Sequence, residues 1–300
     1  MENIKIANIC GLCAGCKFAI NTTKAQKKNN NSVTLFKEIV HNENVNLSLK
    51  NIGIAFKDKI EDLSSDELVI IRAHGEPKKT FEYLNKKGIS YIDCTCVNVK
   101  NIHNLVEEYS KNGYTNIIIG KYGKVSKTMH PEILGTIGWS QSEPILIEDE
   151  EDLKKIENFK NQKFYLTCQT TFNELKADKL IEKITEILQN NNNLITINKS
   201  ICSAQKVINE SSMQLANISD LMLVVGSKSS SNTTELYNNL KNICTTVFID
   251  DINNYKQILK NENITFSKNT KIGITAGAST DPEELKNLKI KIEGEICQII

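Results

Sequence analysis

The chain has 300 residues, of which 40% are hydrophobic and 24% are charged, a composition typical of a soluble globular protein with two or three domains. A net charge of +1 provides no field that would attract nucleic acid or an anionic membrane. The longest apolar runs, such as Leu221–Val225, are too short to cross a bilayer, and Met1–Ile9 lacks the apolar stretch of a signal peptide. We therefore expect a cytoplasmic protein.

Short apolar segments alternate with segments of helical spacing along most of the chain. The expected strands are Ile4–Ile9, Glu67–Arg72, Ile89–Asp93, Asn116–Gly120, Phe164–Thr167, Leu194–Ile197, Leu221–Gly226, Thr246–Ile249 and Lys271–Thr275. Helical stripes are formed by Ile102, Leu105, Val106 and Tyr109, by Ile181, Ile184 and Leu188, and by Leu236, Leu240 and Ile243. This alternation predicts an α/β fold with mostly parallel sheets, in which ligands bind at the carboxyl ends of strands.

The chain contains nine cysteines, an odd number that, in a reducing compartment, argues against a disulfide framework. Cys13, Cys96 and Cys202 each follow an expected strand and lie about one α/β lobe apart. This spacing favours one thiolate per lobe at a shared metal or cluster site. Cys10-x-x-Cys13-x-x-Cys16 begins like a bacterial ferredoxin motif, but Ile20 occupies the fourth cysteine position. The alternative is that most cysteines are small buried hydrophobic residues.

Three of the four histidines, His41, His74 and His130, lie in expected strand-end loops beside glycine, proline or polar residues. A single loop histidine is usually a solvated surface group, whereas three beside candidate cysteine loops favour a ligand site. His103 instead belongs to a helical stripe.

The segment Gly226–Asn232 follows an expected strand and precedes a helix. Its hydroxyls, amide and backbone N–H groups suit an anion, although it lacks the Walker spacing and could equally be an N-cap. Ser279 offers another hydroxyl in an equivalent loop.

Taken together, these motifs resemble the 4-hydroxy-3-methylbut-2-enyl diphosphate reductase family, the LytB-type iron–sulfur reductases. The resemblance extends from Ala7 to about Leu285. Its landmarks, in chain order, are Gly11-Leu12-Cys13-Ala14-Gly15, Glu38-Ile39-Val40-His41-Asn42, Ala73-His74-Gly75, Thr95-Cys96, His130-Pro131-Glu132-x-x-Gly135-Thr136, Gln169-Thr170-Thr171, Ile201-Cys202, Gly226-Ser227-Lys228-x-Ser230-Ser231-Asn232 and Thr275-Ala276-Gly277-Ala278-Ser279. Each motif is weak alone, and their order makes the resemblance specific.

The resemblance implies three α/β lobes in a pseudo-threefold trefoil around a central [4Fe–4S] cluster. The lobes would span residues 1–96, 97–199 and 200–300. Cys13, Cys96 and Cys202 would be the cluster ligands, and the iron without a cysteine would accept the substrate hydroxyl.

The resemblance also implies the reaction, the reductive dehydroxylation of 4-hydroxy-3-methylbut-2-enyl diphosphate to isopentenyl and dimethylallyl diphosphate. Glu132 would deliver protons, assisted by His130 and Thr170. The substrate-binding residues would be His41, His74, His130, Thr170, Ser230, Ser231, Asn232 and Ser279. No flavin or nicotinamide fingerprint is present, so an external donor such as ferredoxin or flavodoxin would supply electrons.

The chain departs from the family pattern near these positions. Gln205 stands where the family has Thr, Phe18 where it has Arg, Glu76 where it has an apolar residue and Val97 where it has Pro, and extra residues within Lys124–Met129 precede His130. Four further cysteines, Cys10, Cys16, Cys94 and Cys168, are expected in loops facing the cluster.

These departures leave two alternatives. One is a divergent paralogue that reduces a different small substrate at the same open cluster. The other is a non-catalytic cluster protein for redox sensing or electron transfer, in which the Cys16 thiolate would cap the open iron. The presence of Glu132, Thr170 and the diphosphate residues argues against the second alternative.

Overall fold

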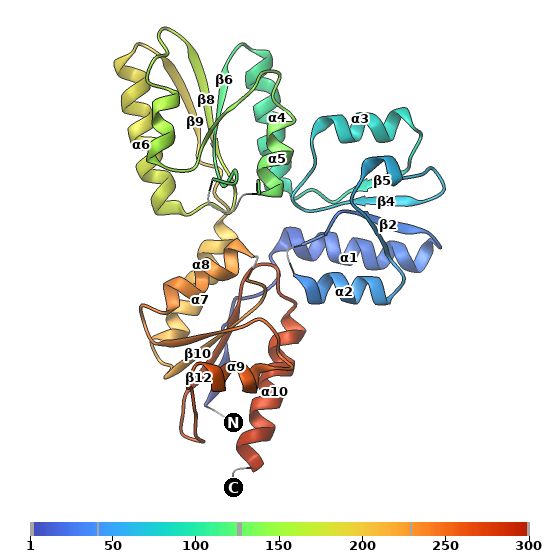
Figure 1. Cartoon of the computed structure of the whole chain (residues 1–300), viewed down its shortest axis with the longest axis vertical. Coiled ribbons are helices and arrows are strands. Elements are labelled where there is room, and N and C mark those ends of the chain that lie inside the picture. The colour runs from blue at the N-terminus through green and yellow to red at the C-terminus, as the bar shows by residue number, and fades with distance from the viewer. Residues whose placement is uncertain (1–2, 41, 125–127, 229, 299–300) are drawn as a thin grey trace. The chain divides into compact units, whose positions relative to one another are not determined.

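The structure, a computed structural model, describes residues 3–40, 42–124, 128–228 and 230–298. Three parallel four-stranded sheets, with helices on their faces, make up the fold (Figure 1). The expected α/β class with parallel sheets is therefore confirmed. Two compact units divide the chain. Unit 1 contains residues 1–20, 40–53 and 203–300, and unit 2 contains residues 21–39 and 54–202.

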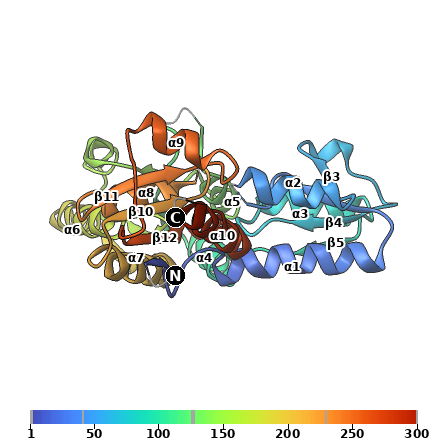
Figure 2. The same ribbon diagram turned by 90° about the horizontal axis from the view of Figure 1, so that it is seen from below.

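Unit 1 contains one sheet in the order β1-β12-β10-β11. Its strands are β1 (Ile4–Ile6), β10 (Leu221–Val225), β11 (Thr245–Ile249) and β12 (Ile272–Ala276), and its helices are α2 (Glu43–Asn51), α7 (Ser203–Ala216), α8 (Ser231–Leu240), α9 (Tyr255–Asn261) and α10 (Pro282–Gln298). Leu223 packs into the core formed with α9 and α10, whereas Met222 and Val224 pack into the core formed with α7 and α8. Figure 2 shows α7 and α9 on opposite sides of this sheet. Apolar residues on both faces of β10 explain its continuous apolar run in the sequence.

Unit 2 contains two sheets, in the orders β3-β2-β4-β5 and β7-β6-β8-β9. The first comprises β2 (Val33–Phe36), β3 (Ala55–Lys57), β4 (Leu68–Ile71) and β5 (Tyr91–Asp93), with helix α3 (Lys78–Lys86) and the short helix η1 (Ile60–Asp62). The second comprises β6 (Thr115–Ile119), β7 (Ile145–Ile147), β8 (Lys163–Cys168) and β9 (Leu194–Asn198), with α4 (Val97–Lys111), α5 (Pro131–Ile137), η2 (Glu150–Lys155) and α6 (Glu174–Asn190). Helix α1 (Ala14–Asn29) runs from the residues of unit 1 into those of unit 2.

The second sheet of unit 2 lies between α4 and α6 (Figure 1). Phe164 and Leu166 on β8 pack with α6. Tyr165, between them, packs with α4, where its ring stacks on Tyr109 at a centroid distance of 4.1 Å. The alternation of side chains along β8 thus serves two cores.

Every expected strand is present, with shifted ends: β1, for example, ends at Ile6 rather than Ile9. The three expected helical stripes lie in α4, α6 and α8, although Ile243 falls beyond α8, which ends at Leu240. The sequence did not predict β2, β3 or β7. These strands have only three or four residues, and β3 and β7 are edge strands with one partner each, so they carry little periodic signal.

The N-terminal strand pairs with a strand from the other end of the chain. β1 lies parallel to β12, with Ile4 opposite Ile272. Pairing with β1 satisfies the backbone groups along the free side of β12, which is buried along its whole length. The lobe boundaries 1–96, 97–199 and 200–300 remain a prediction, but the first strand of the first predicted lobe belongs to the sheet of the third.

Among the described helices, none combines the length and the apolar character needed to cross a membrane.

Candidate active site

Glu132 is a buried carboxyl group in the first turn of α5, with 2% of its surface exposed. The backbone N–H of Thr170 donates to Oε1 at 2.6 Å and its hydroxyl donates to Oε2 at 2.7 Å. Burial raises the pKa of Glu132 from 4.5 to about 7, against the opposing effect of the two hydrogen bonds from Thr170. A carboxyl group with this pKa is partly protonated at neutral pH and suits a general acid.

Two histidines accompany this carboxyl group in unit 2. His130 is the N-cap of α5, and its Nδ1 accepts a hydrogen bond from the Glu132 N–H at 3.2 Å. In the neutral ring the proton is therefore on Nε2. The His74 ring meets the His130 ring edge to face, with 5.6 Å between centroids. One connected group is therefore formed by four residues that the sequence predicted for the site, His74, His130, Glu132 and Thr170. They follow strands that lie far apart in the sequence.

His103 packs against the loop that carries His74. Its buried ring stacks on Trp139 with centroids 5.2 Å apart, and burial lowers its pKa to about 4, so it is neutral. Gly75, at φ +75°, lies so close that an added Cβ would be 2.6 Å from His103 Cε1. The absence of a side chain at Gly75 therefore lets the His74 loop pack directly on His103. The sequence placed His103 on a helical stripe, and it does lie in α4.

Each of the three predicted ligand cysteines is the residue directly before a helix. Cys13 precedes α1, Cys96 precedes α4 and Cys202 precedes α7. Helix N-termini favour the thiolate form, which is the form that ligates iron. For Cys13, the hydrogen bond with the Cys16 side chain is the main cause that lowers its pKa to about 6, and backbone N–H groups add to it while burial opposes it. These residues therefore fit the ligand set of an iron–sulfur cluster.

The backbone N–H of each of the three cysteines donates a hydrogen bond to a carbonyl oxygen in another loop. The Cys13 N–H donates to Ala278 O at 3.0 Å, the Cys96 N–H to Ala73 O at 2.9 Å and the Cys202 N–H to Thr170 O at 2.8 Å. Each acceptor either is a predicted substrate residue or directly precedes one, Ser279 or His74. Cys13 belongs to unit 1, and Cys96 and Cys202 belong to unit 2. Within the described residues, no three His, Cys, Asp or Glu side chains are grouped as a metal site.

In unit 1, the predicted diphosphate residues Ser230, Asn232 and Ser279 lie at or next to the start of α8. Ser230 is the N-cap of α8, and the Ser279 hydroxyl donates to the Ser230 hydroxyl at 3.3 Å. Gly277 lets the loop that carries Ser279 approach α8 closely, since an added Cβ would lie 2.3 Å from Thr233 Oγ1. Hydroxyl groups at a helix N-terminus form a favourable anion site.

Asn232 follows in the first turn of α8, and its Oδ1 is buried without a hydrogen-bond partner among the described residues. The Gln205 amide donates to the Asn232 carbonyl oxygen at 3.2 Å, so this departure from the family pattern contacts the backbone of the predicted diphosphate segment. His41 lies outside the described residues, and so does the side chain of Ser231.

The expectation that four further cysteines lie in loops facing the cluster is wrong for Cys16, which is in α1, and for Cys168, which is in β8. Cys94 and Cys168 are 0% and 1% exposed. Burial raises the thiol pKa of Cys94 to about 11 and that of Cys168 to about 12. β8 extends one residue beyond the expected strand, which turns the Cys168 side chain into the core shared with α6. These two cysteines are therefore small core residues.

Glu76, another departure, is part of a buried ion cluster that the sequence did not predict. Its carboxylate lies 2.8 Å from Arg72 Nε and 2.7 Å from Lys37 Nζ, and its backbone oxygen accepts a hydrogen bond from Trp139 Nε1 at 3.0 Å. Arg72 and Glu76 flank the Ala73-His74-Gly75 loop, so the cluster holds both ends of the loop. Unlike Glu76, Val97 is exposed.

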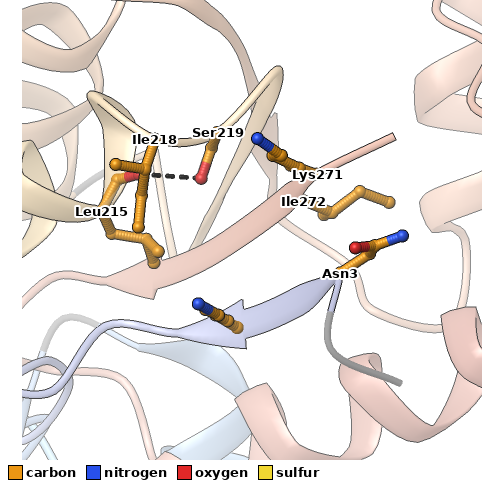
Figure 3. Close-up of a pocket in the computed structure, with 7 residues that line it drawn as sticks. Asn3, Leu215, Ile218, Ser219, Lys271 and Ile272 are labelled. Carbon is orange, nitrogen blue, oxygen red and sulfur yellow. Dashed lines mark hydrogen bonds between the residues drawn. The ribbon is translucent and has the colours of Figure 1, made fainter. Parts of the chain in front are cut away.

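Two pockets in unit 1 differ in their position relative to the predicted site residues. One of about 230 Å³ lies at the amino ends of β1 and β12, with Asn3, Ser219 and Lys271 among its lining residues (Figure 3). No predicted site residue lines it. A second of about 470 Å³ is lined by Asn42, Glu43, Asn44, Gly226, Ser227, Lys228, Asp250 and Asp251. This pocket lies at the carboxyl ends of β10 and β11, beside the predicted diphosphate segment, as expected for a parallel sheet.

Known proteins resemble this chain over most of its length. The family model described as LytB protein matches residues 4–293. A 4-hydroxy-3-methylbut-2-enyl diphosphate reductase from Clostridioides difficile is 32% identical over 284 residues, which cover 93% of this chain and 94% of the relative. A protein of the same name from Caldanaerobacter subterraneus is 33% identical over 306 residues, which cover 97% of this chain and 99% of the relative.

Solved structures of similar proteins also match this chain over most of its length. A structure of (E)-4-hydroxy-3-methyl-but-2-enyl diphosphate reductase, described as the terminal enzyme of the non-mevalonate pathway, has a TM-score of 0.73 and 30% identity, with 98% of this chain and 100% of that chain covered. The E-1-hydroxy-2-methyl-but-2-enyl-4-diphosphate reductase from Plasmodium falciparum has a TM-score of 0.80 and 26% identity, with 97% and 87% covered. The order of the motifs, the three parallel sheets and these relatives together establish that the chain belongs to the LytB protein family.

Proposed function

We propose that this protein is a 4-hydroxy-3-methylbut-2-enyl diphosphate reductase, which converts that allylic alcohol into isopentenyl and dimethylallyl diphosphate. The reaction consumes an electron pair and a pair of protons. The C–O bond breaks, the hydroxyl group leaves as water with one proton, and the allyl carbon skeleton takes the other. The observation that carries the proposal is the hydrogen-bonded connection from Glu132 through Thr170 to Cys202, because it joins a proton donor to a candidate cluster ligand.

Cys13, Cys96 and Cys202 would hold a [4Fe–4S] cluster, which when bound supplies electrons and an open iron for the substrate hydroxyl. Their common position before a helix supports this assignment. An external one-electron donor such as ferredoxin or flavodoxin would reduce the cluster, and the protein would work in the cytoplasm.

Glu132 would donate the proton that turns the hydroxyl group into water. Its pKa of about 7 leaves it partly protonated at neutral pH, and Thr170 fixes both carboxyl oxygens. His130 fixes the backbone of Glu132 through the N-cap contact and would present its Nε2–H to the substrate.

The diphosphate would bind to hydroxyl, amide and imidazole donors, which suit an anionic group. Ser230 and Ser279 contact each other at the start of α8, and Asn232, whose Oδ1 is buried, lies in its first turn. His41, His74, His130, Thr170 and Ser231 complete the proposed set.

The proposal is tested by anaerobic turnover of the allylic diphosphate with reconstituted protein and an artificial reductant. We expect both isopentenyl and dimethylallyl diphosphate. Glu143→Gln, at an exposed position, serves as a control with wild-type turnover. A protein with a full cluster that leaves this substrate unchanged would favour the paralogue alternative, in which Gln205 shapes the site for a different small substrate.

The non-catalytic alternative depends on Cys16, whose side chain is hydrogen bonded to Cys13. This contact directs the two thiols toward each other and makes Cys16 a candidate for the open iron. Mössbauer spectra separate the two cases. An enzyme has one distinct iron site that shifts when the diphosphate is added. Spectra of four equivalent thiolate-ligated irons that do not change when substrate is added, and that become inequivalent in Cys16→Ala, would support the electron-transfer alternative.

A further inference from the structure

A side-chain amide from one ligand-bearing helix contacts the sulfur at the start of another. Asn98 Nδ2 donates to Cys202 Sγ at 3.4 Å, a normal length for a hydrogen bond to the large sulfur atom. Asn98 is the second residue of α4 and follows the proposed ligand Cys96 by two positions. Asn98 is an exposed residue, and its amide reaches Cys202 from the first turn of α4.

We propose that Asn98 is a positioning residue that raises the reduction potential of the cluster through its hydrogen bond to the Cys202 sulfur. This inference rests on the proposed function, because it requires Cys202 to be a cluster ligand. It concerns a residue outside the ligand, acid and diphosphate sets described above.

The direction of the effect follows from electrostatics. A ligand thiolate carries negative charge, and an electron added to the cluster increases the charge on its sulfurs. An N–H dipole that points at sulfur stabilises the reduced form more than the oxidised form, which raises the potential.

The same contact has a structural consequence. The Cys202 backbone is already bonded to Thr170, so the Asn98 amide holds the side chain of a residue whose main chain is fixed. The sulfur is thereby oriented from the α4 side, and the Cys96 and Cys202 ligands share one local framework. A helix N-terminus next to each cysteine acts in the same electrostatic direction as the amide.

The test is an EPR-monitored redox titration of the reconstituted protein, with iron and sulfide content measured for each variant. Asn98→Leu removes the donor and keeps the number and branching of the side-chain heavy atoms. We expect an approximately tenfold lower equilibrium constant for one-electron reduction, which corresponds to about 59 mV. Asn98→Asp keeps the shape but places a negative group near the sulfur, so its potential should fall further. Asn104→Leu, the same change at an exposed position about 9 Å further along α4, should leave the potential unchanged.

A second measurement does not depend on the variants retaining the cluster. Resonance Raman spectra of the wild-type cluster in D₂O should show a shift of an iron–cysteine sulfur mode, because the bonded amide protons exchange. Absence of this shift would overturn the inference, as would unchanged potentials in both Asn98→Leu and Asn98→Asp with full clusters. Loss of the cluster in Asn98→Leu, with retention in Asn104→Leu, would support the orienting role. A wild-type protein that binds no cluster would instead refute the proposed function.

Discussion

Replacing Thr170 by Val should change the pH dependence of turnover in a direction that the structure specifies. Burial raises the pKa of Glu132 to about 7, and the Thr170 hydrogen bonds restrain that rise. Thr170→Val removes the hydroxyl donor at 2.7 Å from Oε2 and leaves the backbone donor at 2.6 Å from Oε1. The pKa of Glu132 should therefore rise further in the variant.

The magnitude follows from the strength of the lost contact. A hydrogen bond to a charged acceptor contributes about 1.5–3 kcal/mol, and one pKa unit corresponds to about 1.4 kcal/mol, so the pKa should rise by about one unit or more. If protonated Glu132 is the acid, wild-type kcat should fall about tenfold per pH unit well above pH 7. In Thr170→Val this alkaline limb should move to higher pH. The backbone contact between Thr170 and Cys202 is retained, but kcat itself should fall because Thr170 also belongs to the proposed substrate-binding set.

The assay is kcat measured from pH 6 to 9 with saturating diphosphate and an artificial reductant, for wild type, Thr170→Val and Glu132→Gln. Glu132→Gln should lose about 10²-fold or more in kcat and lose the alkaline limb. Thr185→Val, which removes a hydroxyl bonded to a backbone oxygen within α6, is the control. An alkaline limb that moves to lower pH in Thr170→Val, or persists unchanged in Glu132→Gln, would refute this reasoning.

The same pKa has a consequence for stability. Because the folded-state pKa of this carboxyl is raised from 4.5 to about 7, ionisation of Glu132 favours unfolding. The free energy of unfolding should therefore decrease as pH rises from about 4.5 to about 7, by about 3 kcal/mol from this group. Glu132→Gln should be more stable than wild type at pH 8 but not at pH 4, measured by denaturant unfolding of the cluster-free protein.

Three further substitutions test the site and its support. Cys96→Ser should strip iron from anaerobically purified protein, and full iron and sulfide content would remove Cys96 from the ligand set. Gly75→Ala should lower the free energy of unfolding by about 1–3 kcal/mol more than Gly88→Ala does, because the new Cβ at position 75 would lie 2.6 Å from His103 Cε1. Gly88 is also at positive φ but has no neighbour within 4 Å, so its variant isolates the backbone component, and equal losses would argue against the packing role. Glu76→Ala should cost about 3–5 kcal/mol in urea unfolding because it leaves the buried Arg72 cation without its carboxylate partner. A loss below about 1 kcal/mol would show that water replaces the carboxylate.

Much of this protein could be predicted from local sequence. Strands such as Leu221–Val225 are buried on both faces, so they appear as continuous apolar runs, and the stripes of α4 and α6 repeat at the helical period. The order of the polar strand-end motifs indicated the family. Such features depend on neighbours within a few residues, and the sequence therefore contains them directly.

Only the tertiary structure decided which distant residues meet and which groups are buried. The pairing of β1 with β12 and the contact between Asn98 and Cys202 join segments that no local period relates. The sequence placed Cys168 in a loop facing the cluster, whereas the structure buries it in the core as the last residue of β8. The raised pKa of Glu132 likewise has no sequence signature, since it arises from loss of solvent around a carboxyl group that packing encloses.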